Sequence, residues 1–415
     1  MKNIASSSRR TLLHALFLFC TAAVSTDLVA APKKPLQIYI LAGQSNMQGH
    51  AKISTFEHIG MDPATKPMLT EMLGADGKPK VCERVWISSI GCGKGGDTDE
   101  QTGKLTAGFG ASPEKIGPEF TFGLYMEKFT DAPILLIKTS WGGKSLNTDF
   151  RPPIAGPYVF NETQLAQFQK QGKDIEAMKA EKAKQTGVYY RLMIEHVKKV
   201  LGDIKRVCPS YNPSAGYELA GFAWLQGWND MVDSGTYPNR DKSGGYDAYS
   251  TVMADFIRDV RKDLGTPKLP FVIGVIGVGG PVSEYGPEEQ RYKTTHQNFR
   301  DAMAAPAKLP EFQGDVTALL TEKYWDLELK RARAKDSKLH EEAKKLARES
   351  SRKLTPAEER AALDKLRAEQ LTERERNILE VGVSNFEFHY LGSAKILGGI
   401  GKGFAEAMAP LAKKH

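Results

Sequence analysis

The feature that most constrains the fold of this chain is a series of short, continuously apolar runs. They are rich in Val, Ile, Leu and Phe, and four of them are predicted strands: residues 36–42, 132–139, 220–225 and 271–278. A strand that is apolar at nearly every position is typical of a parallel sheet buried on both faces. The runs therefore predict a parallel sheet at the centre of the molecule.

Amphipathic helical patterns lie between these strands. In residues 246–264 the apolar side chains recur on one helical face, and residues 190–201 show a second such face. Strands that alternate with helices predict a three-layer α/β/α architecture. Active sites of such folds lie outside the carboxyl ends of the strands.

The segment of about residues 326–379 differs from the rest because Lys, Arg, Glu, Ala and Leu dominate it. Thr355 and Glu358 form a capping box, with Pro356 at the first helical position. We expect one or two charged helices, inserted into the α/β domain. They form either a solvated helical hairpin or an arm that binds a partner.

The N-terminus has the pattern of a secretory signal peptide over residues 1–31. Arg9 and Arg10 precede an apolar run at residues 12–24, and Ala30 and Ala31 provide a small-residue cleavage site. The main domain then spans residues 32–415, and the protein is exported to the periplasm or beyond the cell. The run is short for a membrane span, so we expect none after cleavage, although an uncleaved anchor is the alternative.

The charge and the cysteine content limit which partners and cofactors the sequence can predict. The net charge is +7, or about +5 without the leader, and the basic residues are interleaved with acidic ones, so no nucleic-acid partner is predicted. Cys82 and Cys92 form a disulfide or remain free buried thiols, and Cys208 is left over. No metal-binding spacing is found, and we predict neither a metal nor a cofactor.

Ser45 lies just past the first predicted strand, within the sequence Gly43-Gln44-Ser45-Asn46-Met47. If a helix starts there, its free N–H groups and dipole favour negative charge beside the hydroxyl. A serine in this setting can act as a nucleophile when a base is near. A plain N-cap role for Ser45 is the alternative.

Four motifs in order give a resemblance to a known family. They are GQSNM at residues 43–47, SWGGKS at 140–145, WLQGWND at 224–230 and HYLGSA at 389–394. The chain resembles SGNH hydrolases, in particular the sialate O-acetylesterase-like and family-6 carbohydrate esterase branch, from residue 36 to about residue 408. The resemblance implies a flavodoxin-like three-layer sheet and a serine esterase.

The resemblance also assigns roles. Ser45 is the expected nucleophile and His389 its base, with the oxyanion held by the Ser45 N–H, by Gly142 or Gly143, and by the side-chain amide of Gln226. Three further residues are candidates for substrate contact, with a helix-start role as the alternative for the last of them: Gln44, Asn46 and Glu119.

The sequence departs from the family at the acid that orients the histidine. Phe386 stands three residues before His389, where relatives have Asp, and Trp228 stands where some relatives have Glu. Asp230 is the first candidate for the acid and Glu387 the second. A serine–histidine dyad without an acid is the remaining option.

The resemblance therefore implies a carbohydrate acetylesterase that acts through an acyl-enzyme on O-acetylated glycan or sialic acid. Loss of the acid at two family positions keeps open a non-catalytic carbohydrate-binding homologue of the same fold. A lipase or thioesterase is a third reading, but the loops after Ser45 and around Gly91 are polar and glycine-rich rather than apolar.

Overall fold

The structure is a computed structural model that describes residues 34–93, 95–349, 352 and 354–414. The predicted signal peptide, residues 1–31, lies outside these residues. Among the helices that are described, none is both long and apolar enough to cross a membrane.

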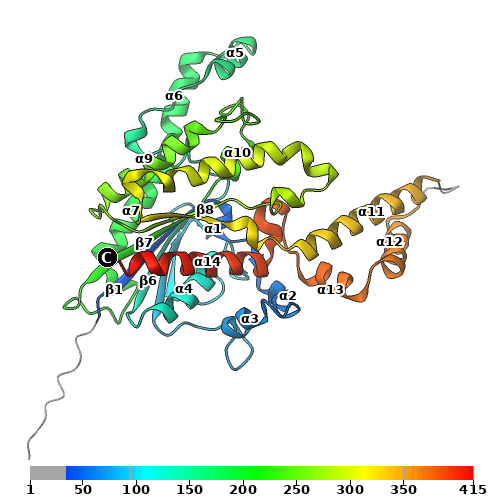
Figure 1. Ribbon diagram of the computed structural model, residues 1–415, viewed down its shortest axis with the longest axis horizontal. Helices are drawn as coiled ribbons and strands as arrows, with labels where there is room; N and C mark the ends of the chain where they lie inside the picture. Colours follow the sequence, from blue (N-terminus) through cyan, green and yellow to red (C-terminus); the bar gives the residue numbers. More distant parts are fainter. Residues whose placement is uncertain (1–33, 94, 350–351, 353, 415) are drawn as a thin grey trace, which may run out of the picture. The chain divides into compact units, whose positions relative to one another are not determined.

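A seven-stranded sheet forms the centre of the domain (Figure 1). All neighbouring strands pair in parallel except the antiparallel edge strand β4. In spatial order the strands are β4 (Glu100–Lys104), β3 (Val85–Ile90), β6 (Ile134–Ser140), β1 (Leu36–Gly43), β7 (Tyr217–Leu225), β8 (Phe271–Val275) and β9 (Val316–Leu320). The four predicted strands correspond to β1, β6, β7 and β8.

Helices cover both faces of the sheet, so the predicted three-layer α/β/α architecture is confirmed. On one face, α4 (Pro118–Phe129) packs against α14 (Ala394–Ala412), and together they contact β3, β6, β7, β8 and β9. The other face carries α7 (Val188–Gly202), α9 (Asp247–Asp263) and α10 (Lys293–Ala304). The helical patterns at residues 190–201 and 246–264 correspond to α7 and α9.

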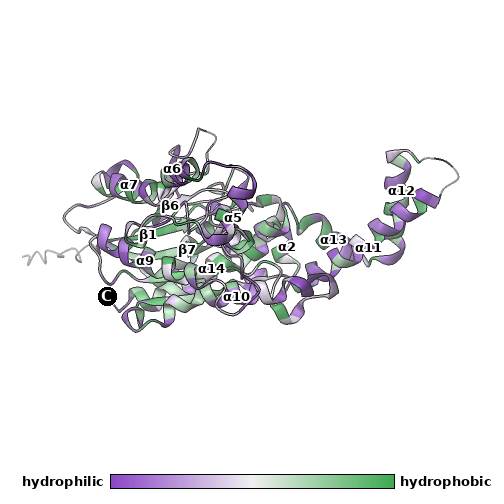
Figure 2. Cartoon of the chain, turned by 90° about the horizontal axis from the view of Figure 1, so that it is seen from above, coloured by the Kyte–Doolittle hydropathy of each residue, from purple (hydrophilic) through white to green (hydrophobic). Residues whose placement is uncertain are grey.

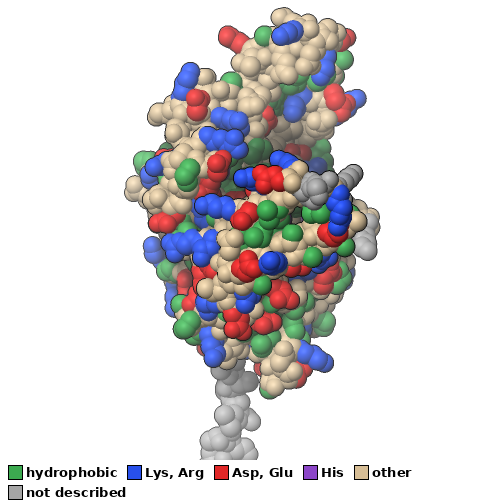
Figure 3. Space-filling model, turned by 90° about the vertical axis from the view of Figure 1, so that its right-hand side faces the viewer, with side chains coloured by type: hydrophobic (Ala, Val, Ile, Leu, Met, Phe, Trp, Pro, Cys, Tyr) green, Lys and Arg blue, Asp and Glu red, His purple; other side chains and the backbone are tan. Residues whose placement is uncertain are grey.

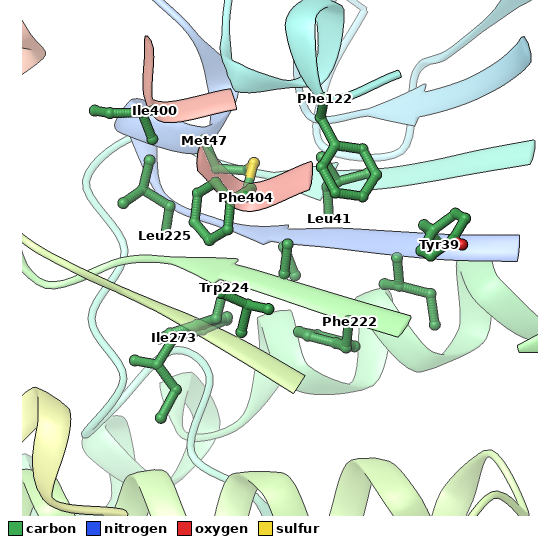
Figure 4. Packing of buried hydrophobic residues seen from close by; sticks show 14 of the residues in the cluster. Tyr39, Leu41, Met47, Phe122, Phe222, Trp224, Leu225, Ile273, Ile400 and Phe404 are labelled. Carbon is green, nitrogen blue, oxygen red and sulfur yellow. The ribbon is translucent and has the colours of Figure 1, made fainter. Parts of the chain in front are cut away.

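The core lies between these layers and is continuous through the sheet. Trp224 of β7 packs its ring 4.5 Å from that of Phe256 on α9, while Tyr39 of β1 meets Phe122 of α4 on the opposite face at 5.5 Å. Figure 4 shows Met47 beside Phe404 of α14 on that same face. Each large apolar side chain buried in this way stabilises the fold by about 1.5–3 kcal/mol relative to exposure.

Three strands of the sheet were not predicted: β3, β4 and β9. The sequence predicted a polar, glycine-rich loop around Gly91, but β4 follows shortly after Gly91 and pairs with β3. Its sequence, Glu-Gln-Thr-Gly-Lys, has no apolar residue because an edge strand needs pairing on one side only and is largely solvated. A separate two-stranded sheet joins β2 (Ala51–Lys52) to β5 (Lys115–Ile116).

The remaining helices of the α/β domain are short or lie at its surface. They are α1 (Ser45–Gln48), α2 (Phe56–Gly60), α3 (Lys66–Met72), α5 (Glu162–Lys170), α6 (Ile175–Gln185) and α8 (Trp228–Val232).

The charged insertion forms three helices rather than the one or two expected: α11 (Leu327–Glu349), α12 (Pro356–Gln370) and α13 (Glu373–Val381). The capping box of Thr355 and Glu358 is present at the start of α12. Leu339, Leu366 and Leu371 belong to a small separate core between the helices. Figure 2 shows that polar residues cover most of α11 and α12, and on the face in Figure 3 basic and acidic side chains are interspersed.

Ion pairs fix the base of the insertion to the α/β domain. The buried carboxylate of Asp326, just before α11, lies 3.4 Å from His58 Nε2 of α2 and 2.7 Å from Lys395 Nζ of α14. Lys395 also pairs with Asp62 at 3.0 Å. The start of the insertion is therefore held by elements from both ends of the chain.

Cys82, Cys92 and Cys208 are all buried and free. Of the two alternatives for Cys82 and Cys92, the structure has the free thiols.

Candidate active site

Ser45 is the first residue of α1 and lies at the carboxyl end of β1, as the sequence predicted. The turn from strand to helix requires glycine, because a Cβ at Gly43 would collide with the carbonyl oxygen of Leu225 on β7. The N–H of Gln44 is bonded to that same oxygen at 3.2 Å. The cap position is held by Gln44 rather than Ser45, so the hydroxyl of Ser45 is not used as a cap.

A buried ion pair holds the far end of α1. Lys138 of β6 is fully buried, and its ammonium group donates to the carbonyl of Gln48 at 2.8 Å, to that of Phe109 at 2.7 Å and to Glu119 Oε2 at 2.8 Å. Glu119 is also fully buried and accepts the N–H of Gly117 at the start of α4. Glu119 thus makes the contact expected of a helix-start residue and has no exposed surface.

His389 lies in the turn Glu387–Gly392, which is in contact with α1. Its imidazole stacks on that of His50, with ring centroids 4.0 Å apart and planes at 3°. Ser384 bridges the two segments, since its Oγ accepts the N–H of Lys52 at 3.1 Å and donates to the carbonyl of Gly392 at 2.7 Å. The structure therefore brings the segment of His389 to that of Ser45, although no hydrogen bond joins the two side chains among the described residues.

The partner of His389 is a residue that sequence reasoning missed. Nδ1 of His389 lies 2.9 Å from Oδ1 of Asn385, and the same oxygen accepts the N–H of Phe386 at 2.8 Å. The second bond identifies that atom as the amide oxygen, so Nδ1 must carry the proton and donate it. Nε2 of His389 is then unprotonated and able to act as a base. An Asn four residues before the His, beside the missing Asp, was the available signal.

The backbone directly after His389 is strained. Tyr390 and Leu391 have φ angles of 52° and 61°, which bulky L-residues rarely adopt, and both side chains are fully buried. The hydroxyl of Tyr390 accepts the N–H of Gly277 after β8 at 2.9 Å and is bonded to Thr321 Oγ1 after β9 at 2.7 Å. These bonds and burial hold the strained turn in place.

Backbone donors lie beside Ser45. A Cβ built on Gly142 would be 4.0 Å from Cβ of Ser45, so this glycine approaches the nucleophile closely. Gly143 has φ of 75°, where glycine is favoured, and faces open space. Within the part of the chain that is described, no protein group accepts a hydrogen bond from the N–H of Ser45, Gly142 or Gly143. These three N–H groups are thus without a protein acceptor in the described chain.

Gln226, the predicted side-chain donor, is already engaged. Its Nε2 donates to Asp230 Oδ2 at 2.5 Å and to the carbonyl of Lys144 at 3.1 Å, and it lies 3.3 Å from Gln44 Oε1. Its Oε1 accepts from Tyr249 at 3.1 Å. To donate to a substrate, Gln226 would have to give up one of these bonds.

Asp230, the first candidate for the acid, is fully buried and contacts a different part of the site. Its carboxylate accepts the N–H groups of Leu146 at 2.8 Å and Asn147 at 3.1 Å and the hydroxyl of Tyr237 at 3.2 Å. Burial raises the pKa of Asp230 to about 6, although these bonds and that from Gln226 lower it. Asp230 therefore anchors the loop that carries Gly142 and Gly143, and it makes no hydrogen bond to His389.

The other candidates are placed as follows. Gln44 is buried, and its Oε1 accepts the N–H of Gly227 at 3.2 Å, so it joins the starts of α1 and α8. Asn46 is buried with Oδ1 free of any hydrogen-bond partner among the described residues. Glu387 is exposed and lines a cavity beside the site, with no hydrogen bond to His389 in the described chain.

Both histidines of the stack are neutral at physiological pH. Burial, together with the charge of Lys115, lowers the pKa of His389 to about 4. Burial lowers the pKa of His50 to about 3, and interactions with His389, Lys115 and Lys138 lower it as well. A neutral His389 has the protonation state that a general base requires.

The fold and this site together define a class of protein. It is a three-layer α/β/α protein with a serine at a helix N-terminus, free glycine amides beside it and a neutral histidine on an adjoining segment, all at the carboxyl edge of the parallel sheet.

The family follows from comparison with known proteins. The model described as "Carbohydrate esterase, sialic acid-specific acetylesterase" matches residues 35–327. The chain belongs to this family. The match contains Ser45, Gly142, Gln226 and Asp230, and it ends at the first residue of α11, so it does not include His389. A comparison with curated proteins found no match.

Three solved structures are similar to parts of this chain at low sequence identity. A protein from Arabidopsis thaliana is 18% identical, with a TM-score of 0.37, and the alignment covers 69% of this chain and 86% of that one. A carbohydrate acetylesterase from Xanthomonas citri is 14% identical, with a TM-score of 0.36 and coverage of 68% and 49%. NanS is 12% identical, with a TM-score of 0.37 and coverage of 69% and 78%.

Proposed function

We propose that this protein is a serine esterase of the SGNH type that removes O-acetyl groups from carbohydrate through an acyl-enzyme. Membership of the carbohydrate esterase family supports the reaction class. The observation that carries the proposal is the meeting of three distant segments. Ser45, Gly142 and the turn of His389 converge at one edge of the sheet.

The chemistry follows from these groups. Ser45 Oγ attacks the acetyl carbonyl while Nε2 of His389 takes its proton, and the N–H groups of Ser45 and Gly142 or Gly143 bind the oxyanion. The C–O bond to the sugar then breaks, and His389 returns the proton to the sugar oxygen. Water, activated by His389, attacks the acetyl-serine, and acetate leaves. Because no hydrogen bond joins Ser45 Oγ to Nε2 of His389 in the described chain, these two atoms have to come within hydrogen-bonding distance when substrate binds.

Two polar groups support the reacting ones. Asn385 fixes the tautomer of His389, and Asp230 fixes the loop of Gly142 and Gly143. Under this proposal the site is a serine–histidine pair oriented by an amide, with Asp230 as a positioning residue. Each glycine donor aimed at the oxyanion is worth about 2.7–4 kcal/mol of barrier.

The test is hydrolysis of p-nitrophenyl acetate by the wild type, Ser45→Ala and His389→Ala, with folding checked by circular dichroism. We expect each substitution to lower kcat by about 10³-fold or more. Equal rates in wild type and Ser45→Ala would overturn the proposal and favour the non-catalytic carbohydrate-binding homologue. A chain-length series in which p-nitrophenyl octanoate reacts faster than the acetate would instead favour the lipase or thioesterase.

An exported location is part of the proposal. It rests on the sequence pattern of residues 1–31. Mass spectrometry of the mature N-terminus, expected just after Ala31, tests it, and an intact Met1 in the mature protein would contradict it.

A further inference from the structure

The chain enters and leaves the helical insertion on either side of one buried side chain, His58 of α2. Nε2 of His58 lies 3.4 Å from the carboxylate of Asp326, directly before α11. On the other edge of the ring, a Cβ built on Gly382, the residue after α13, would lie 3.0 Å from Nδ1. The imidazole of His58 is 1% exposed, so both ends of the insertion contact a side chain that is shielded from solvent.

The helix that closes the insertion also packs against α2 (Figure 1). Arg374 of α13 donates to the carbonyl of Met61, directly after α2, at 3.0 Å. Leu379 of α13 packs against the main hydrophobic core. The end of the insertion therefore has a defined position on the α/β domain, with α2 as its seat.

Residues 383–388 connect the insertion to His389, and they are bonded to the turn that carries it. The N–H groups of Ser384 and Asn385 both donate to the carbonyl of Leu391, at 2.9 and 3.0 Å. Asn385 also accepts the proton on Nδ1 of His389. A shift of the chain where it leaves the insertion would thus be passed directly to the imidazole.

Ser384 ties this connection to the segment after Ser45 as well. Its hydroxyl accepts the N–H of Lys52 on β2 and donates to the carbonyl of Gly392. A Cβ on Gly392 would lie 2.6 Å from the Ser384 hydroxyl oxygen, so glycine is required for this close approach. The connection from the insertion therefore meets both segments that the proposed reaction brings together.

We propose that His58 is a positioning residue of the proposed esterase. It seats both ends of the insertion and thereby fixes, through Ser384 and Asn385, the place of His389. The inference rests on the proposed function, since it takes His389 as the base. On this account the insertion supports the catalytic histidine and is more than a solvated helical hairpin.

The first experiment compares His58→Ala with His196→Ala, the loss of another buried histidine. His196 lies on α7 on the other face of the sheet, with Nε2 2.9 Å from the Ser88 hydroxyl. We expect both variants to have a lower Tm than wild type. Below the Tm of both, only His58→Ala should lower kcat for p-nitrophenyl acetate, by about 10–100-fold with little change in KM, because a misplaced base slows the chemical step.

The conservative variant His58→Gln completes this experiment. Its amide can still donate to Asp326, so we expect it to recover most of the lost kcat. A kcat of His58→Ala equal to that of the wild type, or an equal loss in His196→Ala, would show that His58 contributes only to stability and would overturn the inference.

The second experiment tests the path through Ser384. Ser384→Ala loses the bonds to Lys52 and Gly392 and should lower kcat by a similar factor. If both residues act through the same connection, the His58→Ala/Ser384→Ala double variant should lose far less than the product of the two single losses. Losses that multiply would mean that His58 does not act through Ser384, and the inference would be wrong.

The third experiment does not depend on activity. Long-range ¹H–¹⁵N NMR follows the titration of His389, with the spectrum of His389→Gln for assignment. Burial and the charge of Lys115 lower the pKa of His389 to about 4 in the wild type. In His58→Ala the loosened imidazole should gain solvent, so its pKa should rise toward the ordinary value of about 6.5, and it should not move in His196→Ala.

The NMR result separates this inference from the proposed function. His50 and Lys115, which act on His389, are unchanged in all of these variants, so a moved pKa reports a moved imidazole. An unmoved pKa in His58→Ala would overturn the positioning role. A wild type that does not hydrolyse p-nitrophenyl acetate, together with a moved pKa in His58→Ala, would contradict the esterase proposal and support the positioning of His389.

Discussion

The imidazole rings of His50 and His389 lie face to face, 4.0 Å apart and within 3° of parallel. His50 Nδ1 is buried and has no hydrogen-bond partner among the described residues, so the contact between the rings is the main interaction of the His50 side chain. On the other side, Phe388 meets His389 edge-on at 4.4 Å. The base of the proposed reaction is thus held between two rings.

This stack gives the first prediction. His50→Ala should lower kcat for p-nitrophenyl acetate by about 10–100-fold, because an imidazole free to tilt is misplaced by about 1 Å. His50→Phe, which keeps a flat ring, should recover most of the loss. Steady-state kinetics on the two variants decides the matter: equal losses would mean that the ring plane is not what His50 supplies.

The second prediction concerns pH. Since the pKa of His389 is lowered to about 4 by burial and Lys115, the base is protonated only below that pH. The value of kcat/KM should therefore rise through about pH 4 and stay level above it. In Asn385→Asp a carboxylate beside Nδ1 stabilises the imidazolium and should move the acid limb up by about 1–3 pH units. An unmoved limb would show that Asn385 does not contact His389 in the working enzyme.

Asp230 gives the third prediction. In Asp230→Asn the side chain can no longer accept both N–H groups of Leu146 and Asn147, so the loop of Gly142 and Gly143 shifts. We expect kcat to fall by about 10–100-fold while the acid limb of the pH profile stays in place. Asp233→Asn, an exposed change on the same turn, is the control. A displaced acid limb would restore Asp230 as the residue that orients His389.

The buried pair of Lys138 and Glu119 gives the fourth prediction. Lys138→Met leaves Glu119 as an uncompensated buried charge and should lower the free energy of unfolding by about 3–5 kcal/mol. The Lys138→Met/Glu119→Gln double variant removes both charges and should be more stable than the single one. Urea denaturation measures both, and a double variant less stable than Lys138→Met would contradict this account.

The fifth prediction concerns the edge strand β4. Burial alone would raise the pKa of Glu100, but hydrogen bonds from Arg206, Ser88 and Lys199 lower it to about 2. A carboxyl group whose pKa is lower in the folded state contributes stability that is complete above its unfolded value, about 4.3, and is lost as the pH falls through the folded value. Unfolding free energies measured between pH 5 and 2 should thus decline less steeply in Glu100→Gln than in wild type. Parallel slopes would rule out Glu100 as a source of the decline.

The sequence was most informative where the local pattern of residues is enough to determine the structure. The apolar runs that became β1, β6, β7 and β8 are buried on both faces, so their pattern is unambiguous. Strand β4 lies at the edge of the sheet and is polar, so its sequence has no strand pattern. It is a strand because it pairs with β3, which the sequence does not show. The position of Ser45 followed from the strand before it and the glycine turn.

The supporting residues of the site were harder to predict because their roles depend on distant contacts. Asp230 has the residue type of a catalytic acid, but the fold directs its carboxylate to the backbone of residues 146 and 147. Asn385 has a residue type that is common in turns, so its place four residues before His389 was a weak signal until the structure showed the contact between them. Glu119 was a candidate for substrate contact because the sequence does not show its partner. That partner is Lys138, which lies on β6, later in the sequence.

The strained turn after His389 makes the reactive group dependent on distant parts of the sheet. Besides burial, the hydrogen bonds of the Tyr390 hydroxyl to Gly277 and Thr321, beyond the ends of β8 and β9, hold Tyr390 and Leu391 at their unfavourable φ angles. A substitution that loosens either of those strand ends would let this turn relax to an ordinary conformation and carry the imidazole away. Such a substitution, although distant from Ser45, would then abolish esterase activity while the protein stays folded.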